Sequence, residues 1–262
     1  MNVRIFFTPS ALLPTTAPLD DIYIVVDAIR CTTTLSVIFE QGALRVFVAG
    51  SIEQARWAAK EHPGRILCGE RNARAIPGFD YSNSPVQFST IDLAGRELIL
   101  TTTNGTRAFY ACPQESILLA GSFYNARAVA AHALELGYEQ NKNIAVVCSG
   151  ELDYFALDDA TCAGYIAHIM QQHHTMHERT LPKKDDGQTS PLHIHESVEA
   201  AIALFEVYKP PKIMNHCNSA RSVIEVGLID DVYFCMQMSK SECIPVVVGK
   251  EEDTGLWILE RI

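Results

Sequence analysis

The stretch Ile22–Val26 holds five apolar, mostly β-branched residues and runs directly into Asp27. An apolar run of this length predicts a central strand that is buried on both faces. Asp27 then lies at the carboxyl end of the strand, the edge where open α/β sheets bind their ligands. Arg30 and three threonines follow at the start of a helix pattern. A carboxylate, a guanidinium and hydroxyls at one turn suit an anion held with a metal cation. The structural alternative is that Asp27 only caps the turn and Arg30 lies at the surface.

Strand and helix patterns alternate along the rest of the chain. Strands are predicted at Val3–Phe7, Leu44–Val48, Glu97–Leu100, Ile117–Leu119, Ile144–Cys148, Val232–Met236, Ile244–Val248 and, as a last edge strand, Leu256–Leu259. Helices are predicted at Thr33–Gln41, from Ser51 onward, at Arg107–Ala111, up to Leu136, and at Ala160–Gln171, Ser197–Tyr208 and Ser219–Val226. This alternation predicts a three-layer α/β/α fold with a mixed, largely parallel sheet, in a single domain spanning residues 1–262.

The pattern A-G-S-x-x-x-A-R occurs twice, at Ala49–Arg56 and Ala120–Arg127. It suggests an internal duplication, with repeated units near residues 22–62 and 96–136. Coincidence is the alternative, because helices that follow strands often start with Gly-Ser. A duplication would place the Asp27 turn and the polar turn Thr101–Thr106 in equivalent positions, each at a strand's carboxyl end.

Residues 172–191 are rich in His, Lys and Asp, with Gly and Pro, and predict an exposed insertion. Five histidines here or close by raise the alternative of a zinc site: His173, His174, His177, His193 and His195. Their neighbours are polar and loop-like, so a solvated insertion is favoured over a metal site.

Composition and charge narrow the function classes. The formal net charge of −10 argues against nucleic-acid binding, which needs a basic surface, but still permits a small anionic substrate. No targeting segment or membrane-spanning run is visible. The eight cysteines form no C-x-x-C pair, which is typical of reduced thiols in a cytoplasmic protein. A moderate apolar excess weakly favours a homodimer.

Two further loops carry polar residues at turn density. The loop after residue 68 contains Glu70, Arg71 and, near its end, Asn83 and Ser84. Long irregular segments in compact domains are commonly functional, and arginines bind phosphate, sulfonate or carboxylate through paired N–H groups. In the turn Thr101–Thr106, backbone N–H groups and hydroxyls can hold an anion. A third turn, after Cys148, supplies Glu151, Asp153, Asp158 and Asp159, which either compensate a helix dipole or ligate Mg²⁺.

Four motifs in this order resemble the 2-phosphosulfolactate phosphatase family: D-A-I-R-C-T-T-T, G-E-R…I-P-G-F-D-Y-S-N-S-P, T-T-T-N-G-T and L-D-D-A-T-C-A-G. The resemblance spans residues 1 to about 248. It implies a Mg²⁺-dependent phosphatase acting on 2-phospho-3-sulfolactate, a step of coenzyme M synthesis in methanogens. Cys31, Tyr81-Ser82 and Asp158 depart from the residues usual in the family, which leaves the choice of substrate open.

The resemblance and the residue chemistry together assign roles as a hypothesis. Asp27, Arg30 and Asp159 are expected to be catalytic, and Asp27 and Asp159 are expected to hold Mg²⁺ with Glu70. The residues expected to bind the acid groups of the substrate are Arg71, Thr32, Thr33, Asn83, Ser84, Asn104, Gly105 and Thr106. Either water activated by the metal or the Asp27 carboxylate attacks phosphorus; the sequence does not separate these mechanisms.

Two alternatives belong to other classes. Cys68 and Arg74 fit the C-x₅-R spacing of a metal-independent cysteine phosphatase, which needs a thiolate of low pKa. A non-catalytic organic-anion-binding protein would share the fold and the anion site. An aspartyl-phosphate enzyme of the haloacid-dehalogenase type is disfavoured, because Ile29 occupies the position of its second acidic residue.

Overall fold

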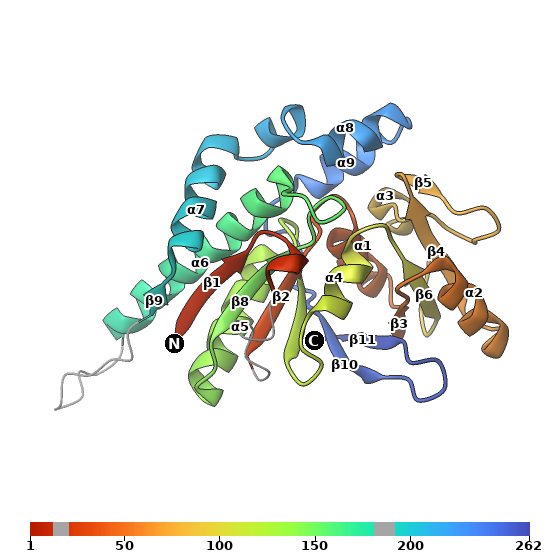
Figure 1. Cartoon of the computed structure of the whole chain (residues 1–262), viewed down its shortest axis with the longest axis horizontal. Coiled ribbons are helices and arrows are strands. Elements are labelled where there is room, and N and C mark those ends of the chain that lie inside the picture. The colour runs from red at the N-terminus through yellow and green to blue at the C-terminus, as the bar shows by residue number, and fades with distance from the viewer. Residues whose placement is uncertain (13–20, 181–191) are drawn as a thin grey trace.

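A computed structural model describes residues 1–12, 21–180 and 192–262 of the chain (Figure 1). The described strands form one eleven-stranded sheet in the order β5-β4-β6-β3-β11-β10-β7-β2-β8-β1-β9. Helices pack on both faces of this sheet, which confirms the α/β fold with a mixed, mostly parallel sheet. Within the described ranges, no helix combines the length and the apolar character needed to cross a membrane.

The element bounds follow the sequence closely in the first half of the chain. The strands are β1 (Asn2–Phe6), β2 (Ile22–Val26), β3 (Arg45–Val48), β4 (Ile66–Arg71), β5 (Arg74–Ala75), β6 (Glu97–Thr101), β7 (Ile117–Gly121), β8 (Ile144–Cys148), β9 (His193–Ile194), β10 (Pro245–Lys250) and β11 (Trp257–Arg261). The α-helices are α1 (Cys31–Glu40), α2 (Ile52–Glu61), α3 (Pro85–Phe88), α4 (Gly105–Ala111), α5 (Ala126–Gln140), α6 (Leu157–Thr180), α7 (Glu196–Tyr208), α8 (Asn218–Glu225) and α9 (Ile229–Cys235), and the 3₁₀ helices are η1 (Pro9–Ala11) and η2 (Lys212–Asn215).

Strand β2 is buried along its whole length, as its apolar sequence predicts. Ile22, Ile24 and Val26 pack into a core cluster with α5 and α6. Tyr23 and Val25 pack on the opposite face with α1 and α4. Because side chains alternate along a strand, an unbroken apolar run requires a helix layer on each face. Parallel pairing with β7 and β8 then fixes where the residue after the strand lies.

The sheet contains two parallel blocks of strands, β4-β6-β3 on one side and β7-β2-β8-β1-β9 on the other, and β5 pairs antiparallel with β4 at one edge. The antiparallel pair β10 and β11 joins them, because β10 pairs with β7 and β11 pairs with β3. The prediction of a last edge strand at Leu256–Leu259 is therefore half wrong: the strand forms, but it lies inside the sheet. Its partners are distant in sequence, so local pattern does not encode its position.

The internal duplication stays a prediction, with which the strand order is compatible. In the first unit β2, α1, β3 and α2 follow one another, and in the second β6, α4, β7 and α5 do so. Reversing the sheet about the β10–β11 pair exchanges β2 with β6 and β3 with β7. A pseudo-twofold axis at that pair would make the Asp27 turn the counterpart of the turn Thr101–Thr106.

The segment Val232–Met236 is helical, so the prediction of a strand there is wrong. It belongs to α9, which has Asp230 and Asp231 in its first turn and buries Val232 and Cys235 one helical turn apart. A short apolar run does not distinguish a strand from a buried helix segment, and the acidic pair at its start is the signal that favoured a helix.

Helix α6 extends to Thr180, well past the predicted end at Gln171. The predicted insertion near residues 172–191 is therefore helical in its first part, although Gln172, Thr175 and Met176 are exposed as expected, and residues 181–191 lie outside the described ranges. His174 explains part of the extension, because its ring stacks on Tyr138 of α5 at 6.1 Å between centroids. The histidine-rich segment thus begins as a continuation of α6.

Candidate active site

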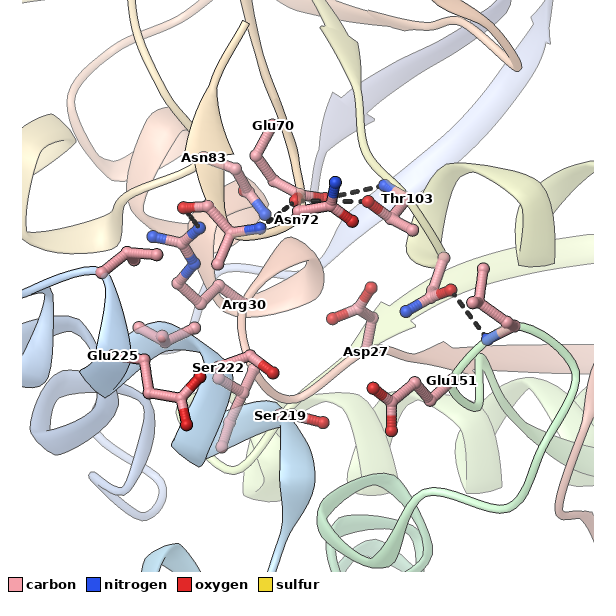
Figure 2. A pocket seen from close by; sticks show the side chains of 16 residues that line it. Asp27, Arg30, Glu70, Asn72, Asn83, Thr103, Glu151, Ser219, Ser222 and Glu225 are labelled. Atoms are coloured by element: carbon pink, nitrogen blue, oxygen red, sulfur yellow. Dashed lines mark hydrogen bonds between the residues drawn. The ribbon is translucent and has the colours of Figure 1, made fainter.

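The turns after β2, β4, β6 and β8 and one side of α8 surround a cavity of about 290 Å³ (Figure 2). The predicted site residues that line it are Asp27, Arg30, Glu70, Asn83 and Asn104. Thr103, in the turn Thr101–Thr106 that was expected to hold an anion, also lines the cavity, whereas sequence reasoning missed Asn72, Ser219, Ser222 and Glu225. Helix α8 carries no motif and reaches the cavity only through tertiary packing, so no signal in the sequence singles it out. Glu151 also lines the cavity, as part of the third turn.

The turn at Asp27 is closed by the threonines that follow it. The Thr32 hydroxyl donates to the Asp27 carbonyl oxygen at 2.8 Å, and the Thr33 hydroxyl donates to the Ala28 carbonyl oxygen at 3.0 Å. The backbone N–H of Cys31 donates to Asp27 Oδ1 at 3.2 Å. Thr32 and Thr33, predicted to bind substrate, are fully buried and instead hold the backbone that presents the Asp27 carboxylate.

Gly105 makes the closest approach to Asp27. A Cβ atom on Gly105 would lie 2.5 Å from Asp27 Oδ2 and 2.6 Å from the Cys31 Cβ. A side chain at this position would displace the catalytic candidate Asp27 or Cys31, so the close packing requires glycine. In the same turn, Thr102 and Thr106 bond each other: each backbone N–H donates to the other's hydroxyl, at 3.2 and 3.1 Å. Gly105 and Thr106 therefore shape the turn and do not line the cavity.

Arg30 forms a buried ion pair with Asp231 of α9, at 2.6 Å between Nη1 and Oδ2. Both side chains are 2% exposed. Arg30 Nη2 also donates to the Ala73 carbonyl oxygen at 2.9 Å, and the Ser84 hydroxyl donates to Asp231 Oδ1 at 2.5 Å. Ser84, predicted to bind substrate, therefore supports Asp231 outside the cavity lining. Asp231 was missed because its segment was assigned to a strand.

Glu70 ties two loops together at the cavity wall. Its carboxylate accepts from the Thr103 backbone N–H at 2.7 Å, the Thr103 hydroxyl at 3.2 Å and the Ala73 backbone N–H at 2.9 Å. Arg71, the next residue, donates to the Thr101 hydroxyl at 3.0 Å and does not line the cavity. The two side chains diverge because neighbouring residues of a strand point to opposite faces.

Asp159 lies behind Asp27, at the first turn of α6. Its Oδ1 accepts from the Ala28 backbone N–H at 2.9 Å, and its Oδ2 accepts from the Gly150 backbone N–H at 3.0 Å. It therefore joins the turns that follow β2 and β8 and is not part of the cavity lining. Its neighbour Asp158 accepts from the Ser219 hydroxyl at 3.0 Å, which links α6 to α8.

Three carboxyl groups at this site have raised pKa values. Burial raises the pKa of Asp27 from 3.8 to about 7, with the charges of Glu70 and Asp158 adding to the effect. Burial likewise raises the pKa of Asp158 to about 6 and that of Asp159 well above its usual range. A cation would favour the ionised form of each group. A divalent cation bound among these carboxyl groups would therefore stabilise their ionised forms.

The chemistry of the lining residues fits Mg²⁺. Asn83 lines the cavity, and its buried Oδ1 atom has no hydrogen-bond partner in the described structure. Together with the carboxylates of Asp27 and Glu151 it offers hard oxygen donors. In the cavity, no three acidic, His or Cys ligand atoms of the described residues lie within 4.8 Å of one another. Asp27, Glu70 and Asp159 thus do not form a common ligand set. A Mg²⁺ site does not require three converging carboxylates, because Mg²⁺ usually keeps several waters and binds only one or two carboxylates plus substrate oxygens.

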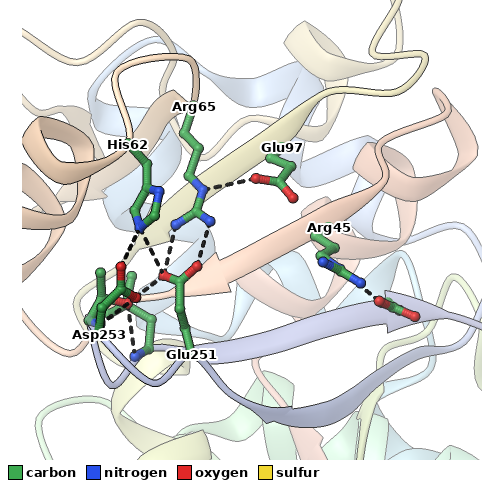
Figure 3. A network of polar contacts seen from close by, with 9 residues as sticks. Arg45, His62, Arg65, Glu97, Glu251 and Asp253 are labelled. Carbon is green, nitrogen blue, oxygen red and sulfur yellow. Dashed lines mark hydrogen bonds and ion pairs between the residues drawn. The ribbon is translucent and has the colours of Figure 1, made fainter.

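A separate cluster of His62, Glu251 and Asp253 does bring three ligand atoms within 4.8 Å (Figure 3). It ties the end of α2 to the turn between β10 and β11. Arg65 pairs with both Glu251 oxygens, at 2.8 and 2.5 Å, and with Glu97 at 3.0 Å. A guanidinium already occupies the place of a cation, so we interpret this cluster as a structural ion-pair network.

Cys68 is unsuited to nucleophilic catalysis. It is fully buried, its thiol donates to the Ile99 carbonyl oxygen at 3.3 Å, and burial raises the pKa of the thiol. Arg74 lies exposed on β5. Catalytic cysteines have lowered pKa values and face a positively charged opening. This geometry removes the cysteine-phosphatase alternative.

The fold and the site define an α/β protein whose strand ends border an acidic cavity of small-ligand size. A family model described as 2-phosphosulpholactate phosphatase matches residues 7–250. The chain belongs to this family.

Relatives named "probable 2-phosphosulfolactate phosphatase" match nearly the whole chain. The relative from Deinococcus radiodurans is 32% identical over 254 residues, covering 96% of this chain and 95% of its own. That from Thermus thermophilus is 33% identical over 233 residues, covering 88% and 89%. That from Thermotoga maritima is 30% identical over 240 residues, covering 91% and 92%. The family resemblance noted from the four motifs is confirmed.

Proposed function

We propose that the protein hydrolyses the phosphate monoester of a small sulfonated or carboxylated 2-hydroxy acid, with Mg²⁺ as cofactor. The names of its relatives give 2-phosphosulfolactate as the substrate, with sulfolactate and phosphate as products. One observation carries the proposal: Asp27, Arg30 and the Thr103–Asn104 turn line one cavity at the carboxyl end of β2. Acidic groups for a cation and donors for an oxyanion are thereby brought together in one site.

Mg²⁺ would be held by Asp27, with Glu151 and the Asn83 carbonyl oxygen as further donors. When bound, the ion neutralises negative charge on the phosphate oxygens, which lowers the barrier to attack on phosphorus. Glu70 and Asp159 act indirectly, because their oxygens are engaged by backbone N–H groups that fix the surrounding turns. They position Asp27 and the wall opposite it.

Arg30 would bind the phosphate. Two of the five N–H groups of a guanidinium are engaged with Asp231 and Ala73, and the side chain still lines the cavity. Asp231 thus fixes the orientation of a group whose donors can align the phosphate for attack. Asp27 is the side chain placed to accept a proton from attacking water or to attack phosphorus itself.

Phosphate release from a panel of phospho-acids, with Mg²⁺ and with EDTA, tests this function. We expect turnover with Mg²⁺ and its loss with EDTA, fastest for esters that carry a second acid group. A non-catalytic anion-binding protein would bind the same acids and release no phosphate from any of them. The homodimer, the cytoplasmic location and the link to coenzyme M synthesis stay predictions.

A further inference from the structure

A second pocket adjoins the cavity and has a different charge. It has a volume of about 290 Å³ and is lined by Pro9, Ser10, Asn104, Arg107, Ala111, Ser149 and Asp153. Asn104 lines both this pocket, which we call the Arg107 pocket, and the cavity at Asp27. The Leu152 backbone N–H donates to Asn104 Oδ1 at 3.1 Å and so holds the shared side chain in place. The Arg107 pocket therefore borders the cavity at Asn104.

The guanidinium of Arg107 is available for a ligand. It reaches Asp153 at 3.5 Å, and both side chains are about half exposed. Exposed ion pairs of this length contribute little free energy, so an anion with better geometry can displace Asp153. Arginine suits sulfonate and carboxylate because its planar donors bind two oxygens at once.

Ser149 supplies an independent sign of a ligand. The residue is 3% exposed, and its hydroxyl has no hydrogen-bond partner among the described residues. Its backbone N–H donates to the Val26 carbonyl oxygen at 2.8 Å, which places it beside the Asp27 turn. A buried hydroxyl without a partner is costly, and an oxyanion in the pocket would satisfy it.

Charge balance explains why a second anion would avoid the cavity itself. Its lining carries the carboxylates of Asp27, Glu70, Glu151 and Glu225, and the charge of its arginine is already matched by Asp231. Mg²⁺ and Arg30 can serve a phosphate there. A sulfonate or carboxylate on the same molecule would be repelled unless it met another cation.

We propose that the Arg107 pocket binds the non-transferred acid group of the substrate, a sulfonate or carboxylate, while its phosphate lies in the cavity at Asp27. This inference rests on the proposed function and adds the pocket that selects substrates with a second acid group. Arg107 and Ser149 contact the acid group, and Asn104 separates it from the reacting phosphate.

The test compares two substrates in Arg107→Gln: 2-phosphosulfolactate and p-nitrophenyl phosphate, which lacks the second acid group. The ratio of their kcat/KM values should fall about 10- to 100-fold, the size expected for losing one charge-assisted contact. The loss should appear in KM for the sulfonated ester. Ser149→Ala should lower the same ratio by a smaller factor. Arg127→Gln removes an exposed arginine outside both pockets and should leave the ratio unchanged.

A ratio that stays constant in Arg107→Gln would overturn the proposal, whether both activities fall together or neither falls. Sulfolactate binding, measured by calorimetry, separates this test from that of the proposed function. If no ester is hydrolysed, sulfolactate that binds the natural protein and fails to bind Arg107→Gln still supports the subsite. Equal sulfolactate affinity in the two proteins contradicts it.

Discussion

Removing Asp231 should destabilise the protein and disable Arg30 together. The carboxylate accepts from Arg30 at 2.6 Å, from the Ser84 hydroxyl at 2.5 Å and from the Val86 backbone N–H at 3.3 Å. In Asp231→Ala, the guanidinium of Arg30 stays buried without a counter-charge. Breaking one side of a buried ion pair costs about 3–5 kcal/mol. For a domain of this size that is a large part of the total stability, about 5–15 kcal/mol.

A matched double variant tests whether the stability lost in Asp231→Ala comes from the unpaired charge of Arg30. Arg30→Met combined with Asp231→Leu replaces both charges with apolar side chains of similar size. Such replacements are often neutral for stability, so most of the free energy of unfolding lost in Asp231→Ala should return. Activity should not return, because no guanidinium would remain at the cavity. The assay is denaturant unfolding of each variant, with phosphate release measured in the same buffer.

If the free energy of unfolding of Asp231→Ala lies within about 1 kcal/mol of that of the natural protein, the predicted cost of the unpaired charge is refuted. Recovery of full turnover in the double variant would refute the role of Arg30 in phosphate binding. The two readouts are separable, because unfolding reports the cost of a buried charge and phosphate release reports the proposed role of Arg30 in binding.

Four further predictions concern the site and Cys68. Gly105→Ala places a Cβ atom 2.5 Å from Asp27 Oδ2 and should reduce kcat about 100-fold by displacing the carboxylate; Gly64→Ala, with nothing within 4 Å of its new Cβ atom, is the control, and equal activity of the two variants would contradict the reasoning. Because burial raises the pKa of Asp27 to about 7, the folded metal-free protein binds protons that the unfolded chain has lost, so its stability should fall as pH rises from 4 to 7. Mg²⁺ competes with these protons, and the rise in Tm that it causes should be larger at pH 8 than at pH 5.5; a larger rise at pH 5.5 would count against ionised Asp27 as the ligand. Cys68→Ser should retain its turnover per folded molecule, and loss of turnover in a folded variant would restore the cysteine mechanism.

The sequence predicted correctly those features that depend on residues close together in the chain. The apolar run of β2 fixes a doubly buried strand, and Asp27 must then follow at its carboxyl end. The helix predicted from Ser51 onward was equally readable, because Ser51 and Gln54 have the spacing of a capping box, and the Ser51 hydroxyl does accept from the Gln54 backbone N–H. Such features depend on a few neighbouring residues only.

Side-chain direction and long-range partners were not readable. Thr32 and Thr33 looked available to a ligand, yet their hydroxyls close the Asp27 turn. Arg71 looked like a phosphate ligand, yet its strand position turns it from the cavity towards Thr101. Asp231 is about two hundred residues from Arg30 in sequence, so only the packing of α9 reveals their pairing.

The turnover of Asp27→Asn tests the central claim most directly. This variant keeps the shape of the side chain and removes its charge, so the fold should survive while the cation and the reacting phosphate lose their principal carboxylate. With saturating Mg²⁺ and 2-phosphosulfolactate, we predict that kcat falls about 10²–10⁴-fold in a protein whose unfolding remains cooperative. A folded Asp27→Asn protein that releases phosphate at the natural rate would contradict the account.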